Sequence, residues 1–273
     1  AELTVKKGAT LTIGNNVDIT NGKIIIEDGA TVNIDTDLYL DKTEILFHNS
    51  TVNVSDAHLD NQSKFWIHGT GTFEFINSYF SDGSQIRGVG NKGTTIVDYC
   101  IFNDSYIDIN NNTLSLNSSV SITNNNFNNS NNYSAISIVN CDTYTIEDNE
   151  IDNYISGIEV WNSGHGKGAY YVRDNTIRNI VSTGLTFYGS SGIIENNTIE
   201  NSLFGIKLLN NSTVELRGNS DANDIYQTQL IQNNDAEEVY ISTYSVPTYF
   251  HYNVIQDYDN GGVNDPLVLH NNP

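Results

Sequence analysis

The sequence predicts an all-β solenoid, in which short strands coil and stack on one another, and three observations support this. A motif with asparagines around one apolar residue recurs in steps of 24, 26, 22 and 22 residues, and such a period is typical of solenoids. Apolar and polar residues alternate with a period of two, which indicates strands. Asn, Gly, Ser and Thr are frequent between these segments, as tight turns require. The first asparagine of the motif falls at Asn125, Asn149, Asn175, Asn197 and Asn219.

The repeat extends into the N-terminal part of the chain. GATLTIGNNVDI at residues 8–19 is followed by GATVNIDTDLYL at 29–40 and NSTVNVSDAHL at 49–59. One apolar position of each repeat is expected to form an inward column. Its members are Ile13, Ile34, Val54, Phe75, Val97, Ile122, Ile146, Val172, Ile194, Leu216 and Val239. They predict about eleven coils of three short strands, and a rod of roughly 50 Å at about 4.8 Å per coil.

The repeats NEIDN, NTIRN and NTIEN resemble those of the right-handed parallel β-helix proteins of the pectin-lyase-like superfamily. The resemblance implies a single-domain right-handed parallel β-helix, which we place at residues 1–239. Residues 240–273 lose the repeat and are expected to form an irregular C-terminal cap of the same domain. This ending is similar to those of non-catalytic secreted bacterial surface modules. The superfamily also contains lyases, hydrolases and epimerases, so the resemblance predicts the fold and leaves the function open.

Two columns of asparagine are predicted to hold the corners of the coils. An Asn side chain can donate its amide to the carbonyl of the next Asn, and Asn also tolerates the left-handed backbone of a sharp corner. The second column would contain Asn129, Asn153, Asn179, Asn201 and Asn223. Charged residues alternate in sign beside both columns, as Glu147, Arg173, Glu195 and Arg217, and as Asp152, Arg178 and Glu200. This order predicts ion pairs between neighbouring strands.

Charge restricts the classes of partner. The chain has 33 acidic and 12 basic residues and a formal charge of −21, which opposes binding of nucleic acid or anionic membranes. Uncharged sugars and divalent cations fit this surface better. No apolar run reaches the roughly eighteen residues of a membrane span. From architecture and composition we expect a secreted or cell-surface protein, present as a monomeric module of a larger chain.

Four aligned segments predict a ligand-binding face. AISIV at 135–139, GIEVW at 157–161, GLTFY at 184–188 and GIKLL at 205–209 would place Ser137, Glu159, Thr186 and Lys207 in one outward column. A neighbouring column would contain Val139, Trp161, Tyr188 and Leu209. Contiguous exposed apolar residues mark an interaction surface. We therefore expect Trp161 and Tyr188 to stack on a polysaccharide or other surface component, with Glu159, Asn162, Thr186 and Lys207 as hydrogen-bonding neighbours. Alternatively, these rings pack under the loop of residues 162–170.

A polysaccharide lyase or glycoside hydrolase is the alternative function, and a purely structural spacer is a third. Gly164-His165-Gly166 is similar to an element of polygalacturonase-like hydrolases, but the Asp-Asp pair of that family is missing. Hydrolysis needs two carboxylates, and only Glu159 is recognised near this loop. The enzyme interpretation places catalysis on His165, Arg173, Glu159 and Lys207.

The sequence contains only weak indications of a metal site or of cysteine chemistry. No cofactor is expected, although Asp257, Asp259 and Asp265 in DYDNGGVND resemble a calcium loop whose spacing does not match an EF-hand. The six histidines show no metal-ligand spacing. Cys100 and Cys141 provide no disulfide framework, and we expect two half-buried free thiols on different faces.

Overall fold

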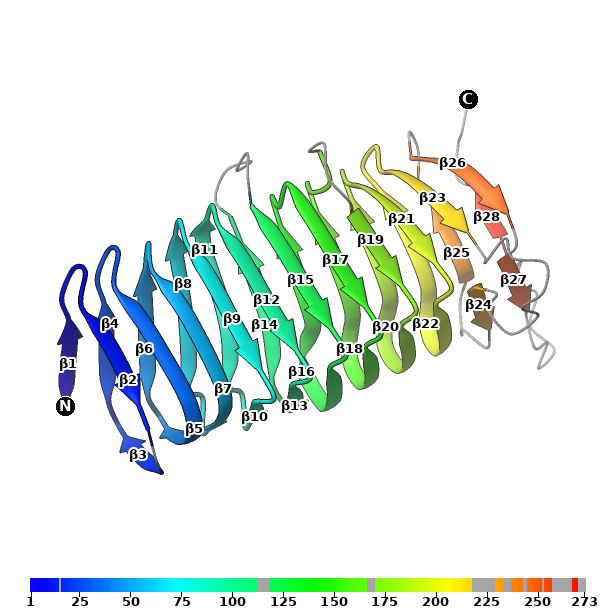
Figure 1. The fold of residues 1–273 in the computed structure, drawn as a ribbon. Coiled ribbons are helices and arrows are strands. Elements are labelled where there is room, and N and C mark those ends of the chain that lie inside the picture. The colour runs from blue at the N-terminus through cyan, green and yellow to red at the C-terminus, as the bar shows by residue number, and fades with distance from the viewer. Residues whose placement is uncertain are drawn as a thin grey trace, which may run out of the picture.

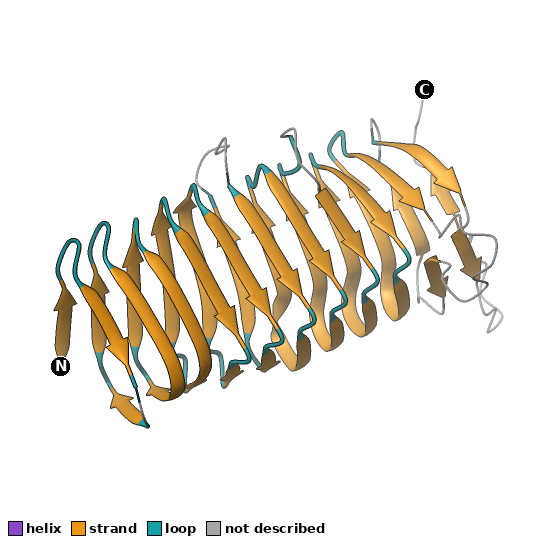
Figure 2. Ribbon diagram, viewed as in Figure 1, coloured by secondary structure: helices purple, strands orange, loops and turns teal. Residues whose placement is uncertain are grey.

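A computed structural model gives the structure of the protein. It describes residues 1–14, 16–111, 118–165, 170–217, 229–232, 237–242, 245–251, 253–256 and 267–269. These residues contain strands and turns and no helix (Figure 2). The strands stack along one axis into an elongated solenoid, with the N-terminus at one end (Figure 1). Every strand pairing is parallel, so the predicted fold class is confirmed.

Each turn of the solenoid contributes one strand to each of three walls, which we call A, B and C in chain order. Wall A contains β1 (Glu2–Val5), β4 (Lys23–Ile26), β6 (Glu44–His48), β8 (Lys64–Gly69), β11 (Gln85–Asn91), β14 (Tyr106–Asn110), β25 (Glu237–Ile241) and β28 (Leu267–Leu269). Wall B contains β2 (Thr10–Ile13), β9 (Thr72–Ile76), β12 (Thr94–Asp98), β15 (Ser119–Thr123), β17 (Thr143–Glu147), β19 (Tyr170–Arg173), β21 (Ser191–Glu195), β23 (Thr213–Arg217) and β26 (Val246–His251). Wall C contains β3 (Val17–Thr20), β10 (Tyr79–Ser81), β13 (Ile101–Asn103), β24 (Gln229–Gln232) and β27 (Asn253–Gln256).

Six long strands bend around a corner and belong to two walls. β5 (Thr31–Asp41) and β7 (Thr51–Asp60) run from wall B into wall C. β16 (Asn126–Val139), β18 (Glu150–Trp161), β20 (Thr176–Tyr188) and β22 (Thr198–Leu209) run from wall C into wall A. The corner that the backbone crosses without a break therefore differs between the two ends of the molecule.

The predicted inward column is confirmed over its first ten members, because strand pairing links Ile13 to Leu216 through wall B. The eleventh assignment is wrong. Phe250 pairs with Leu216, whereas Val239 pairs with Ile206 on wall A. The sequence between Leu216 and Phe250 is longer than one repeat, so counting one period from Leu216 reaches the wrong wall.

About nine turns lie between β1 and β22. Strands β23–β28 continue the parallel pairing, with the segments between them only partly within the described residues. The predicted boundary between helix and cap falls inside β25, and the division at residue 239 stays a prediction.

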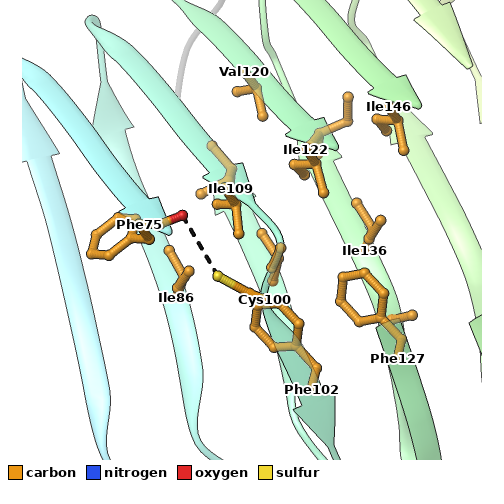
Figure 3. Packing of buried hydrophobic residues seen from close by; sticks show 14 of the residues in the cluster. Phe75, Ile86, Cys100, Phe102, Ile109, Val120, Ile122, Phe127, Ile136 and Ile146 are labelled. Carbon is orange, nitrogen blue, oxygen red and sulfur yellow. Dashed lines mark hydrogen bonds between the residues drawn. The ribbon is translucent and has the colours of Figure 1, made fainter. Parts of the chain in front are cut away.

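The core is a column of apolar side chains that fills the space between the three walls. Where the central turns stack, Phe80 lies parallel to Phe102 at a centroid distance of 4.6 Å, and Phe102 to Phe127 at 4.5 Å. Figure 3 shows Phe102 and Phe127 side by side, with the thiol of Cys100 directed at the carbonyl oxygen of Phe75, 3.5 Å away. All of these side chains are buried, so the alternation of apolar residues is explained by the single internal column that they share.

The first asparagine column is a buried ladder at the corner from wall B to wall C. In each step, the backbone N–H and the side-chain Nδ2 both donate to Oδ1 of the next Asn. The N···Oδ1 distances are 3.1, 3.0 and 3.1 Å and the Nδ2···Oδ1 distances 3.0, 2.9 and 2.9 Å, from Asn125 through Asn149 and Asn175 to Asn197. The prediction of an Asn ladder is confirmed for these four residues. Asn219 lies outside the described residues.

The second asparagine column has a different function. Asn129, Asn153, Asn179 and Asn201 are exposed and have left-handed backbones, with φ between 54° and 61°. They make the bend by which the long strands pass from wall C to wall A, a conformation that Asn adopts more readily than most residues. Asn223 lies outside the described residues. The two tasks that the sequence suggested for asparagine are thus divided between two columns.

Each cysteine precedes a polar ladder. The N–H of Cys100 donates to Asn125 Oδ1 at 2.8 Å, and the N–H of Cys141 donates to Ser163 Oγ at 2.9 Å. The second ladder continues at the corner from wall A to wall B through Ser190, Ser212 and Ser245. Both thiols are free and fully buried, so the expectation of half-buried thiols is corrected. Burial raises the pKa of each thiol to about 12.

Candidate functional site: the outer face of wall A

The outward residues of wall A form two long columns. The first contains Leu46, Trp66, Arg87, Asp108, Ser137, Glu159, Thr186, Lys207 and Tyr240. The second contains His48, His68, Val89, Asn110, Val139, Trp161, Tyr188 and Leu209. The predicted register is confirmed for Ser137, Glu159, Thr186 and Lys207 in the first column and for Val139, Trp161, Tyr188 and Leu209 in the second. From Trp66 to Lys207 the face spans six strand spacings, about 29 Å.

Trp161 and Tyr188 stack on each other at the C-terminal end of this face. Their ring centroids are 4.6 Å apart and the ring planes differ by 27°. Both side chains are half-buried. Because each ring covers one face of the other, the pair presents ring edges and outer faces to a ligand.

The polar residues predicted around this pair have different exposures. Glu159 and Lys207 are half-buried and Asn162 is exposed, but Thr186 is only 7% exposed. The ammonium group of Lys207 lies 3.2 Å from the ring centroid of Phe204. The structure therefore leaves Glu159, Lys207 and Asn162 as groups at the surface, and Thr186 as a packing residue beneath them.

A second aromatic position lies at the N-terminal end of the same face. Trp66 borders a shallow apolar groove of about 250 Å³, whose lining also includes Leu46, His48, His68 and Val89. The Arg87 guanidinium lies 5.0 Å and the Lys64 ammonium 5.7 Å from the Trp66 ring centroid. Cations at this distance from an indole ring are attracted by its electron-rich face. Two cationic side chains thus lie next to the Trp66 ring.

Charged and aromatic residues connect the two ends. Arg87 Nε lies 3.4 Å from Asp108 Oδ2, and Tyr106 and Tyr133 stack with centroids 4.2 Å apart. Burial raises the pKa of Asp108, Arg87 opposes this shift, and the negative charge of Glu159 adds to it. Burial likewise raises the pKa of the Tyr106 hydroxyl. Ser137 separates Asp108 from Glu159 on the column.

Sequence reasoning missed the residues of this central cluster. Extending the column back from Glu159 by the repeat would have reached them, but the step from Asp108 to Ser137 is 29 residues. The steps of the wall B column lie between 20 and 26 residues. The additional residues between β14 and β16 hide the register, because nothing in the sequence shows in which loop they are accommodated.

The residues of the enzyme interpretation do not come together. Glu159 and Lys207 lie on wall A, whereas Arg173 lies on wall B, where its Nη2 is 2.9 Å from Glu147 Oε2 and its guanidinium 5.1 Å from the Tyr171 ring centroid. His165 is exposed in the corner segment between these walls. The reason is geometrical, because outward residues of two walls point in different directions. Arg173 takes part in the predicted ion pairs, as does Arg178, whose Nε lies 3.6 Å from Asp152 Oδ2.

No metal site is found in the described part of the chain, where no group of three or more His, Cys, Asp or Glu side chains is placed to hold an ion. Asp257, Asp259 and Asp265 lie outside it. Within the same residues, no helix is long and apolar enough to cross a membrane.

Comparison with known proteins agrees with this architecture. Residues 156–264 match the family described as "Right handed beta helix region". The matched segment and the parallel strand pairing of the structure both indicate a right-handed parallel β-helix fold. No curated protein sequence matches this β-helix significantly.

Two crystal structures of mutants of the periplasmic alginate epimerase AlgG are similar to this β-helix. The double mutant has a TM-score of 0.58 at 13% identity, over 88% of this chain and 74% of its own. The single mutant has a TM-score of 0.56 at 12% identity, over 98% of this chain and 76% of its own. At this identity the similarity shows a shared fold.

Proposed function

We propose that this β-helix is a non-catalytic extracellular or cell-surface module that binds an extended polysaccharide along the outer face of wall A. The observation that carries the proposal is the continuous face from Trp66 to Lys207, with an aromatic position at each end and charged groups between them. Flat aromatic surfaces with polar groups beside them suit sugar rings, which have apolar faces and hydroxyl edges.

The dimensions and charge of the face support a long, uncharged ligand. A face of about 29 Å suits an extended chain better than a single small molecule, which favours a concave pocket. The formal charge of −21 opposes the approach of a polyanion. The similarity in fold to an enzyme named for alginate, a polysaccharide, adds support at the level of the fold alone.

Binding to a panel of neutral and acidic polysaccharides tests the proposal. Retention of the protein on at least one polysaccharide is expected, and Trp66→Ala and Trp161→Ala should each weaken it about fivefold or more, as expected for loss of an aromatic contact of 1 kcal/mol or more. Tyr171→Ala is the matched control, because Tyr171 is a half-buried outward aromatic residue on wall B. Equal affinity of all variants would exclude wall A as the binding face, and absence of any retention would favour a structural spacer.

One observation favours polysaccharide cleavage as a second candidate function. Asp108 and Glu159 occupy the same outward column two strands apart, about 10 Å along the axis, and burial raises the pKa of Asp108. Two carboxyl groups that flank one bond, with the pKa of one of them raised, are the arrangement used in glycoside hydrolysis. Release of reducing ends or unsaturated products, abolished by Asp108→Asn, would establish this function. Retention without products supports the binding module.

A further inference from the structure

A second groove lies on wall C, near the N-terminal end and away from wall A. Its volume is about 370 Å³, and it crosses four successive strands, β3, β5, β7 and β10. Outward side chains line it in two columns. One contains Asp18, Tyr39, His58 and Tyr79, and the other Thr20, Asp41, Asp60 and Ser81. The groove therefore has an aromatic side and a carboxylate side.

The aromatic side is open at Tyr39. Tyr39 stacks on His58 with centroids 4.8 Å apart and an angle of 17° between the rings, whereas His58 and Tyr79 are 6.0 Å apart and tilted by 39°. The neighbour of Tyr39 on its other side is the shorter Asp18, and 44% of Tyr39 is exposed. One face of the Tyr39 ring is thus available to a ligand, with the carboxylate of Asp18 beside it.

On the carboxylate side, no cationic partner is found among the described residues. Asp41 accepts a hydrogen bond from Asn61 Nδ2 at 2.7 Å and Asp60 one from Ser81 Oγ at 2.6 Å, and both donors are neutral. Among the described residues, no salt bridge involves Asp18, Asp41 or Asp60. Next to the groove, the pKa of Asp82 is raised. The main cause is its hydrogen bond with Asp60, followed by burial and by repulsion from Asp60. Negative charge is concentrated here without compensation.

We propose that this groove binds a polysaccharide of protonated amino sugars, such as a glucosamine polymer. A sugar ring would stack on the free face of Tyr39, and its ammonium groups would lie near Asp41 and Asp60. The two carboxylates are one strand spacing apart, about 4.8 Å, so they attract a ligand with repeated positive charges. An ammonium group next to the Tyr39 ring gains a further cation–π contribution. This proposal does not depend on the proposed function of wall A.

Binding of a glucosamine oligosaccharide and of its fully N-acetylated form, measured by calorimetry, tests the proposal. The glucosamine form should bind, and the neutral acetylated form at least about tenfold more weakly, because the charge contribution is lost. Asp41→Asn and Tyr39→Ala should each weaken binding of the glucosamine form about fivefold or more. Asp41→Asn keeps the shape of the side chain, and Tyr39→Phe keeps the ring and should bind nearly as wild type. These two variants keep the test valid if Tyr39→Ala folds poorly.

Glu74→Gln is the matched control, because Glu74 is an outward, half-buried acidic residue of β9 on wall B, in the same turn of the solenoid as β10 of the groove. It removes one negative charge without touching the groove. Equal weakening by Glu74→Gln and Asp41→Asn would overturn the proposal in favour of diffuse attraction to an acidic protein. Equal binding of the acetylated form would overturn the amino-sugar assignment, as would tighter, Tyr39-dependent binding of an oligolysine peptide. Absence of binding would overturn the site, whereas loss of wall A binding would leave it intact.

Discussion

Besides the serine ladder of the C-terminal half at the corner from wall A to wall B, the two halves of the solenoid have polar ladders at different corners. In β5 and β7 the backbone passes from wall B to wall C without a break, and hydroxyl groups of Thr43 and Ser63 connect the turns at the next corner. In β16 to β22 the unbroken corner is the one from wall C to wall A, and the Asn ladder occupies the corner from B to C. Figure 1 shows β5 and β7 bending near the N-terminal end of the stack, and β16 to β22 bending further along it.

The difference shows how buried polar groups at a sharp corner of a solenoid obtain hydrogen-bond partners. Ser63 has one oxygen, which accepts from the N–H of Thr43 at 3.0 Å and donates to the carbonyl of Leu40 at 2.9 Å. Asn149 accepts two hydrogen bonds through Oδ1 and donates through Nδ2 to the carbonyl of Ile122 and to Asn175. Each Asn therefore satisfies more buried polar groups than each Ser, and we expect the C-terminal half to depend more on its ladder.

The largest effect is expected where the two halves meet. Phe102→Ala removes the middle ring of the stack between Phe80 and Phe127 and leaves a cavity in the core, so the free energy of unfolding should fall by about 3–5 kcal/mol. Urea denaturation followed by circular dichroism measures this change. Tyr99→Ala, at a side chain that is 60% exposed, is the control and should have little effect.

Replacement of a ladder asparagine should cost nearly as much. Asn149→Ala leaves the N–H and Nδ2 of Asn125 and the carbonyl of Ile122 without their partners, and we expect a loss of about 2–4 kcal/mol in urea denaturation. Asn153→Gly is the matched control, because Asn153 is exposed and left-handed, and glycine adopts that conformation freely. Similar losses for the two variants would contradict the division between the two asparagine columns.

The ladder of Thr43 and Ser63 should contribute less to the free energy of unfolding than the Asn ladder. Ser63→Ala removes one acceptor and one donor at a fully buried site, and the expected loss is about 1–2 kcal/mol. Measured alongside Asn149→Ala, it compares the halves directly. A loss as large as that of Asn149→Ala would show that the number of hydrogen bonds per residue does not determine the stability of a corner.

The smallest effect is expected for the reactivity and ionisation of the two buried thiols. Both thiols have a pKa raised to about 12 by burial, against about 8.5 for a free cysteine, so the folded protein should react slowly with iodoacetamide at pH 8. Because the folded-state pKa is raised, the contribution of these neutral thiols to stability is complete below about pH 8.5. It is lost as the pH rises towards about 12. Rapid labelling of Cys100 alone would show that the start of the Asn ladder opens locally.

The repeat could be predicted from the sequence because it depends on the chemistry of residues that are close together in the chain. Asparagines that flank one apolar residue mark the corner from B to C, and alternation marks the strands, so the column from Ile13 to Leu216 and the ladder from Asn125 to Asn197 could be predicted. The wall A face was only partly predictable. Trp161 and Tyr188 were found because four consecutive segments share one pattern of apolar alternation, whereas Arg87 and Asp108 lie beyond the 29-residue step.

The sequence by itself determined the solenoid, because its period and its alternation follow from what each strand must bury. The tertiary structure alone decided which outward residues meet. Tyr39 reaches His58, Arg87 reaches Asp108, and Arg173 is separated from Glu159 by a corner. These contacts join residues of different coils, and they depend on where each coil takes up its additional residues and on which corner its backbone crosses. The period does not contain that information.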